Sequence, residues 1–163
     1  MTTYTLSHTS PKRCELMDPE GNIVYKIFSP ATPGNSDVTI TRGDEVIAVI
    51  HWKWFERSTL TMNGKTTKIN EVFPRPKKIF NSRVYTMPDG YQFQWRGLDM
   101  IYAVNVQTNL NVATYYQNEM YLINEKKSTL DIAAGVSTEL VDVLVVTWVL
   151  YEKKARDWRR SRH

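Results

Sequence analysis

Residues 140–151 form an almost uninterrupted apolar run, broken only by Asp142 and Thr147. Ser137, Thr138 and Glu139 precede the run, and such residues are typical of the first turn of a helix, where they satisfy free backbone N–H groups and the positive end of the helix dipole. A helix that is apolar on every side has to be buried on every side. We therefore predict a helix over about residues 137–151 that lies in the interior of the protein.

Two other structures could carry the same run. Twelve helical residues span about 18 Å, which is short for a hydrocarbon core of about 30 Å, and the run also contains an acidic residue, so a transmembrane helix is disfavoured. The valines suit a β-strand as well, but so long an apolar strand would need both faces buried. The buried helix is the favoured interpretation, and we expect a chain without it to unfold.

The remainder of the chain is typical of β-strands separated by turns. Asn63-Gly64 is a strong hairpin signal, because both residues tolerate the positive φ of a tight turn. Residues 91–96 alternate between aromatic and polar side chains, as a half-buried strand does. A turn at residues 18–22 is expected to join the first two strands in a hairpin. The expected strands are residues 4–8, 23–28, 38–42, 46–55, 58–62, 65–69, 83–86, 91–96, 100–106, 112–116, 120–123 and 129–132.

Short strands with short connections favour an antiparallel meander. An all-round apolar helix fits inside such a sheet when the sheet closes on itself. We therefore predict a mainly β fold, a closed antiparallel barrel of about 12 strands around a central hydrophobic C-terminal α-helix. Residues 1–151 would hold the barrel and the helix, and residues 152–163 would form a basic tail.

The charge is concentrated in that tail. Its six Lys or Arg and two acidic residues carry the whole net charge of +4, so residues 1–151 are neutral in sum and nucleic-acid binding is disfavoured. A membrane surface or anionic lipid is the partner that fits basic clusters flanking a tryptophan. The candidate lipid-binding residues are Arg75, Lys77, Lys78, Lys153, Lys154, Arg156, Trp158, Arg159 and Arg160. A solvated tail without a ligand is the alternative.

No catalytic, metal or cofactor signature stands out. The glycines do not form a phosphate-binding loop, and the three histidines and Cys14 lack the spacing of metal ligands, so we expect neither cofactor nor metal. His51 is the one candidate catalytic residue, as the general acid or base of an enzyme that acts on a small hydrophobic metabolite at a barrel mouth. A solvent-facing strand histidine is the other interpretation. A protein-interaction scaffold, with an unknown partner, is a third function class.

The start of the chain has no apolar core like that of a signal peptide, and a single cysteine cannot form an internal disulfide. These features favour an intracellular protein, either cytoplasmic or peripherally bound to a membrane.

Four motifs together resemble a known family. They are the Asp-x-x-Gly-Asn turn at residues 18–22, the Ile-Ala-x-Ile-x-Trp strand at residues 47–52, the Pro-Asp-Gly-Tyr-x-Phe-x-Trp strand at residues 88–95 and the apolar ending that begins at Asp142. They are similar to uncharacterised fungal proteins of the tubby C-terminal-like superfamily, which also includes plant LURP-one-related proteins and phospholipid scramblases. The resemblance implies a twelve-stranded barrel around a hydrophobic C-terminal helix.

The same resemblance implies a non-enzymatic binding module as the leading function. Tubby domains bind phosphoinositides through a basic pair on the barrel, and scramblases carry calcium-binding segments. No residue of this chain aligns with those motifs, so the resemblance assigns no individual ligand-binding residue.

Overall fold

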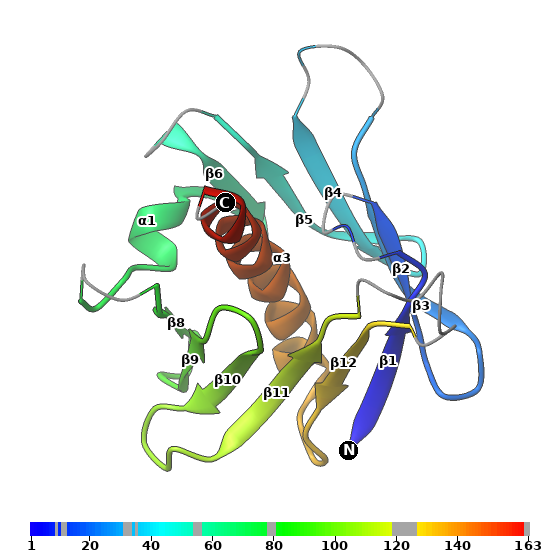
Figure 1. Ribbon diagram of the computed structural model, residues 1–163. Helices are drawn as coiled ribbons and strands as arrows, with labels where there is room; N and C mark the ends of the chain where they lie inside the picture. Colours follow the sequence, from blue (N-terminus) through cyan, green and yellow to red (C-terminus); the bar gives the residue numbers. More distant parts are fainter. Residues whose placement is uncertain are drawn as a thin grey trace.

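Strands dominate the protein because β-branched and aromatic residues alternate with polar ones between turns rich in Gly, Asn and Asp. Figure 1 shows the computed structural model, which describes residues 1–8, 10, 13–30, 34, 36–53, 57–77, 81–118 and 127–161. Its elements in chain order are β1 (Thr2–Leu6), β2 (Cys14–Met17), β3 (Ile23–Phe28), β4 (Asp37–Arg42), β5 (Glu45–His51), β6 (Thr59–Met62), β7 (Lys65–Lys68), α1 (Ile69–Val72), β8 (Arg83–Thr86), β9 (Gln92–Arg96), β10 (Ile101–Asn105), β11 (Asn111–Tyr116), β12 (Thr129–Ile132) and α3 (Thr138–Ser161).

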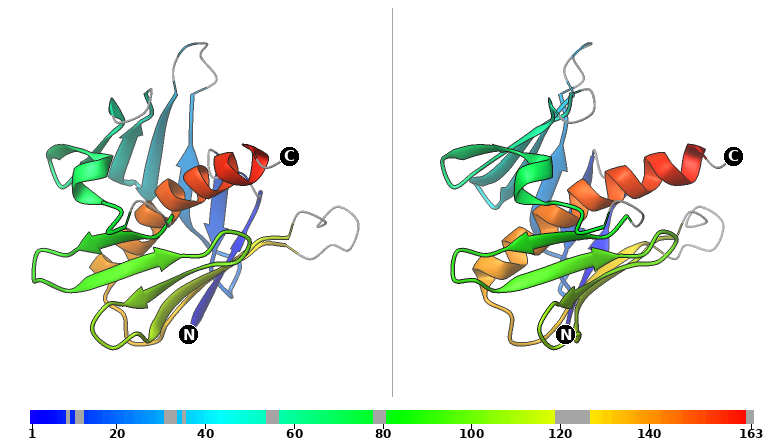
Figure 2. Two further views of the ribbon diagram at one scale, coloured as in Figure 1. Left: turned by 60° about the vertical axis from the view of Figure 1, so that its left-hand side comes forward. Right: turned by 90° about the vertical axis from the view of Figure 1, so that its left-hand side faces the viewer.

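The described strands form one 12-stranded antiparallel sheet in the order β7-β6-β5-β4-β3-β2-β1-β12-β11-β10-β9-β8. The pairing of β1 with β12, in which Thr2 lies opposite Ile132, joins the first strand to the last. The sheet curls around α3, which crosses its concave side (Figures 1 and 2). The mainly β, antiparallel prediction is therefore confirmed.

The prediction of a closed barrel is wrong, because the sheet ends at β7 on one side and at β8 on the other. Between these two strands the chain forms α1 and then passes through Pro74 and Pro76, which have no N–H to donate to a ladder. The Val84 N–H instead donates to the Pro74 carbonyl at 3.0 Å, so the edge of β8 bonds to this irregular segment. We call the gap between β7 and β8, spanned by residues 69–77, the open seam.

The predicted burial of the apolar run is confirmed. Val143 to Glu152 are consecutive buried residues of α3, so this part of the helix is enclosed on all sides. Leu140 and Val141 are half-buried and pack against the same core. The helix does not end near residue 151 as expected but continues to Ser161.

Hydrogen bonds at three positions of α3, Asp142, Thr147 and Tyr151, tie the helix to the sheet and its connections. At its start Asp142 accepts hydrogen bonds from Tyr25 Oη at 2.5 Å and Arg42 Nε at 3.0 Å. In its middle Thr147 Oγ1 accepts from Trp95 Nε1 at 2.8 Å, and farther on the Tyr151 hydroxyl donates to the Gly97 carbonyl at 2.5 Å. Buried polar groups need such partners, and these bonds fix how far α3 slides along the sheet.

Several strand predictions hold and others do not. The Asn63-Gly64 turn is confirmed, with φ of 56° and 73°. The turn at residues 18–22 joins β2 to β3 in a hairpin. The predicted hairpin joined residues 4–8 to 23–28 instead, because the short strand β2 was not predicted. The strand expected at residues 46–55 ends at His51, and the strand expected at residues 120–123 lies outside the described residues.

Candidate functional site

Arg83 is the most unusual charged residue in the sheet. It belongs to β8, its side chain points inward, and only 8% of the residue is exposed. Its guanidinium donates to the Phe73 carbonyl at 2.8 Å and to Asn70 Oδ1 at 3.1 Å, and it lies over the Phe73 ring at 6.0 Å from the centroid. These acceptors are neutral, and no carboxylate among the described residues forms an ion pair with Arg83.

Two more cations lie close to Arg83. Burial and then the positive charge of Arg75 lower the pKa of Arg83. Partial burial also lowers the pKa of Lys154 on α3, and so do the charges of Arg83, Lys153 and Arg75, whereas Asp157 raises it. The charge of Arg75 thus acts on Arg83, and the charges of both act on Lys154, so we call these three residues at the open seam the basic cluster.

The structure thus relates two basic segments that lie far apart in the sequence, the loop at Arg75 and the helix at Lys154, which are separated by 154 − 75 = 79 residues. Trp158 lies one helical turn beyond Lys154 and is 44% exposed. Lys77 and Arg160 are exposed as well. Lys78 lies outside the described residues.

The other basic residues of the expected tail have structural partners. Arg159 forms an ion pair with the buried Glu152 and donates to Gln117 Oε1 at 3.2 Å. Lys153 pairs with Asp157 at 2.7 Å and lies 6.0 Å from the Trp52 ring centroid. Arg156 is half-buried on the inward side of the helix. These contacts explain why α3 continues through a segment that sequence reasoning treated as a tail.

His51 has a carboxylate beside it, as acid–base chemistry requires, but it lies outside the two cavities described below. Its Nδ1 lies 3.0 Å from Asp37 Oδ2 across the β4–β5 ladder, and both side chains are partly exposed. Neither of the two cavities described next is lined by His51.

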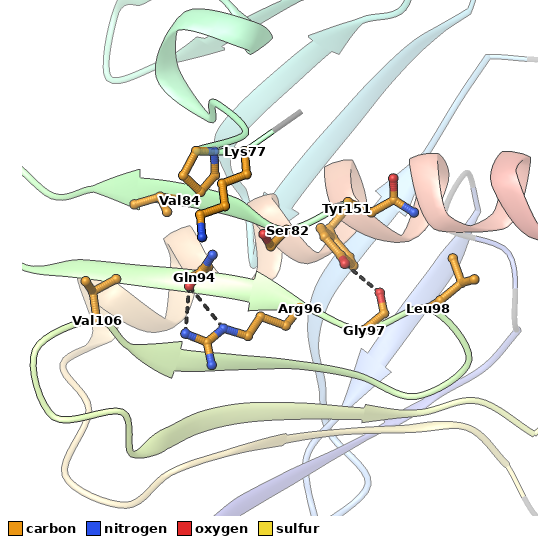
Figure 3. A pocket seen from close by; sticks show the side chains of 11 residues that line it. Lys77, Ser82, Val84, Gln94, Arg96, Gly97, Leu98, Val106 and Tyr151 are labelled. Atoms are coloured by element: carbon orange, nitrogen blue, oxygen red, sulfur yellow. Dashed lines mark hydrogen bonds between the residues drawn. The ribbon is translucent and has the colours of Figure 1, made fainter. Parts of the chain in front are cut away.

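A cavity of about 690 Å³ lies on the outer face of β8 and β9, next to the open seam. Its lining combines the cations Lys77 and Arg96 with Val84, Gln94, Leu98 and Tyr151, among others. Figure 3 shows these side chains along the two strands, with Tyr151 reaching the cavity from the helix. We call this cavity the outer groove.

A second cavity, of about 300 Å³, lies near β2 and β3 and is lined by His8, Arg13, Cys14 and Lys26, among others. Cys14 is buried, and burial together with the charge of Glu15 raises the pKa of its thiol to about 12. A thiol with so high a pKa is not a nucleophile at neutral pH.

The described residues contain no group of three His, Cys, Asp or Glu side chains placed to hold a metal ion. Within the same part of the chain, no helix combines the length and the apolar character needed to cross a bilayer.

Sequence reasoning missed Arg83 and the outer groove. Alternation along β8 would have placed Arg83 on the same inward face as Tyr85, and an inward arginine is a signal that can be read from sequence. The outer groove has no such signal, because it depends on how the segment before β8 approaches the outer face of β9.

The comparisons with known proteins bear on the fold. A family model described as "Family of unknown function (DUF6593)" matches residues 9–157. The X-ray structure of a protein from Arabidopsis thaliana is similar, with a TM-score of 0.51 and 10% identity over 93% of this chain and 90% of that chain. This likeness concerns the fold alone. No curated protein matches.

Proposed function

The chain belongs to the DUF6593 family, whose function is unknown, and we propose that it is a non-enzymatic binding module whose basic cluster engages anionic lipid headgroups at a membrane surface. The observation that carries the proposal is the buried Arg83, whose printed hydrogen bonds go to the neutral Phe73 carbonyl and Asn70 Oδ1, and the charge of Arg75 acts on it as well. Like charges repel, and a buried arginine that bonds only neutral acceptors is poorly compensated. A phosphate group would relieve both costs, because it accepts charge-assisted hydrogen bonds from guanidinium groups.

The surroundings of the basic cluster also suit a lipid surface. Lys154 and Trp158 are four residues apart on α3 and so lie on one face of the helix. Tryptophan favours the headgroup region of a bilayer, and each basic residue near an anionic surface contributes about 1 kcal/mol. Lys77 extends the positive charge beyond Arg75.

The sequence resemblance to the tubby C-terminal-like superfamily supports the same function, since tubby domains bind phosphoinositides through basic residues. The described fold is compatible with that kinship, because a curled antiparallel sheet surrounds an apolar C-terminal helix. The peripheral membrane location expected from the sequence belongs to this proposal.

Vesicle cosedimentation tests the proposal. Phosphatidylcholine vesicles with and without phosphatidylinositol bisphosphate are mixed with the parent chain, with a double variant Arg75→Glu and Lys154→Glu, and with a control double variant Lys26→Glu and Lys65→Glu. The control changes the net charge equally at exposed sites away from the basic cluster. We expect the first variant to bind the anionic vesicles at least about tenfold more weakly than the parent and the control to bind almost as well as the parent.

Equal binding by the parent and the Arg75→Glu and Lys154→Glu variant would exclude the basic cluster as the lipid site. Equal loss in both double variants would mean that net charge alone attracts the protein to the vesicles. Arg159 is left unchanged in this design, because its ion pair with Glu152 stabilises the fold.

A further inference from the structure

The outer groove has an apolar wall. Val84, Gln94 and Arg96 face away from the core, because they alternate along β8 and β9 with the buried Tyr85, Phe93 and Trp95. Val84 and Leu98 supply apolar surface, and Val106, which is 41% exposed, lies at one end (Figure 3). Tyr151 lies near the other end, with its hydroxyl committed to the Gly97 carbonyl. Apolar side chains therefore lie at both ends of the groove, with Gln94 and Arg96 between them (Figure 3).

Neither cation of the groove, Lys77 or Arg96, forms an ion pair with an acidic residue in the part of the chain that the structure describes. The Arg96 guanidinium donates to Gln94 Oε1 from Nε at 3.0 Å and from Nη2 at 2.8 Å, and its Nη1 donates to Asn109 Oδ1 at 3.2 Å. These acceptors are neutral side-chain amides. The Lys77 side chain extends over Val84 toward Gln94 (Figure 3). No carboxylate is among the described residues that line the groove.

We infer that the outer groove binds one monomeric amphipathic carboxylate of the fatty-acid class, with its chain along the wall of Val84 and Leu98 and its carboxylate between Lys77 and Arg96. Charge complementarity selects the anion, because two cations with no acid nearby attract a carboxylate and repel an ammonium group. Volume selects a small ligand, because about 690 Å³ is within the usual range of sites for single small molecules.

This inference goes beyond the membrane function, because the ligand is taken as a monomer and no bilayer is required. The two sites are neighbours, since Lys77 follows Arg75 closely and Val84 follows Arg83. They use different atoms, however. The basic cluster lies at the open seam, whereas the groove lies on the outer face of β8 and β9.

Calorimetric titration with three probes of equal chain length tests the inference. The probes are dodecanoate, dodecanol and dodecyltrimethylammonium, each below the concentration at which it forms micelles. The parent chain is expected to bind dodecanoate at least about tenfold more tightly than dodecanol, since a charge-assisted hydrogen bond is lost with the alcohol, and to bind the cation weakest of all. Dodecanol binding as tightly as dodecanoate, or no binding of any probe, would overturn the inference.

Two variants locate the ligand. Lys77→Gln removes an exposed charge and is expected to weaken dodecanoate binding several-fold to about tenfold, with no change for dodecanol. Val84→Trp fills the groove and is expected to weaken both probes. Their matched controls are Lys26→Gln and Leu110→Trp, because Lys26 is exposed, Leu110 is 68% exposed, and neither residue lines the groove.

These variants also separate the inference from the membrane proposal. Val84→Trp should lose dodecanoate but still cosediment with phosphoinositide vesicles, and the Arg75→Glu and Lys154→Glu variant should retain most of its dodecanoate binding. Dodecanoate binding that is unchanged in both Val84→Trp and Lys77→Gln would place the ligand elsewhere and refute the inference, whatever the vesicle assay shows.

Discussion

The two halves of the continuous helix α3 are held in place by different interactions. Residues 140–151, the apolar half, fill the curled sheet, and from Val143 onward every side chain of this half is buried. Residues 152–161, the charged half, leave the sheet through a shell of ion pairs and end in solvent (Figure 2). The comparison teaches that burial of apolar surface holds the first half, whereas specific charge pairing orders the second and leaves a few cations over for binding.

Removing the whole of α3 is expected to have the largest effect on the stability of the protein. A chain that ends at Ser137 leaves the concave side of the sheet, with residues such as Trp95 and Phe93, without the helix that covers it. We expect this chain to lose cooperative unfolding altogether, because the lost apolar burial exceeds a typical stability of about 5–15 kcal/mol. Circular dichroism during heating measures the cooperativity of unfolding. A sharp transition would show that the sheet folds without α3.

Single tryptophans compare the two halves directly. Trp148 in the apolar half is fully buried against Tyr115, with ring centroids 5.1 Å apart, whereas Trp158 in the charged half is 44% exposed. Trp148→Ala is expected to lower the free energy of unfolding by about 3–5 kcal/mol and Trp158→Ala by less than about 1 kcal/mol. Urea denaturation of both variants checks the contrast. Equal losses would mean that the charged half is packed as tightly as the apolar half.

Two carboxylates compare buried and exposed pairing within the charged half. The Glu152 side chain is 1% exposed and pairs with Arg159, whereas the Asp157 side chain is 49% exposed and pairs with Lys153. Glu152→Gln should destabilise the protein by about 2–4 kcal/mol, because Arg159 loses its buried counter-charge, and Asp157→Asn by about 0.5 kcal/mol or less. Denaturation at low and high salt measures both, and a strong salt dependence for Glu152→Gln would contradict burial of the pair.

The smallest expected effect has the opposite sign. The folded-state pKa of Lys154 is lowered, so its charge disfavours folding below that pKa, and the penalty disappears as the pH rises toward the unfolded value near 10.5. Lys154→Met should therefore stabilise the protein slightly at pH 7, by about 0.5 kcal/mol or less, and the gain should shrink near pH 10. Urea denaturation at the two pH values tests the sign. A loss of stability at pH 7 would show that Lys154 is well compensated.

The apolar half could be predicted from the sequence because a helix that is buried on all sides needs a nearly continuous apolar run, and this run follows residues typical of a helix start. The charged half could not, because Glu152 looks like a surface residue until Arg159 folds back onto it. Alternation predicted β9 closely, whereas β2 has only four residues and gave no clear signal. Closure of the sheet could not be judged from the sequence either, because it depends on whether β7 and β8, which are consecutive strands, pair with each other across the segment that holds α1, Pro74 and Pro76.

The candidate site was predictable in its residue types and not in its geometry. Arg75 and Lys154 stood out as basic, but only the curling of the sheet brings them together. Arg83 was missed, although its alternation with Tyr85 along β8 places it on the inward face. His51 was singled out from the sequence, and the β4–β5 register places Asp37 beside it.

The open seam also affects the order in which the molecule can assemble. Because α3 follows every described strand along the chain, it is synthesised last and has to join strands that already exist. A closed barrel would admit a helix only through one end, and charged residues such as Arg160 would then have to pass through the apolar interior. Because β7 and β8 do not pair with each other, the helix can enter from the side before residues 69–77 pack across the open seam, and no hydrogen bond between β7 and β8 has to break.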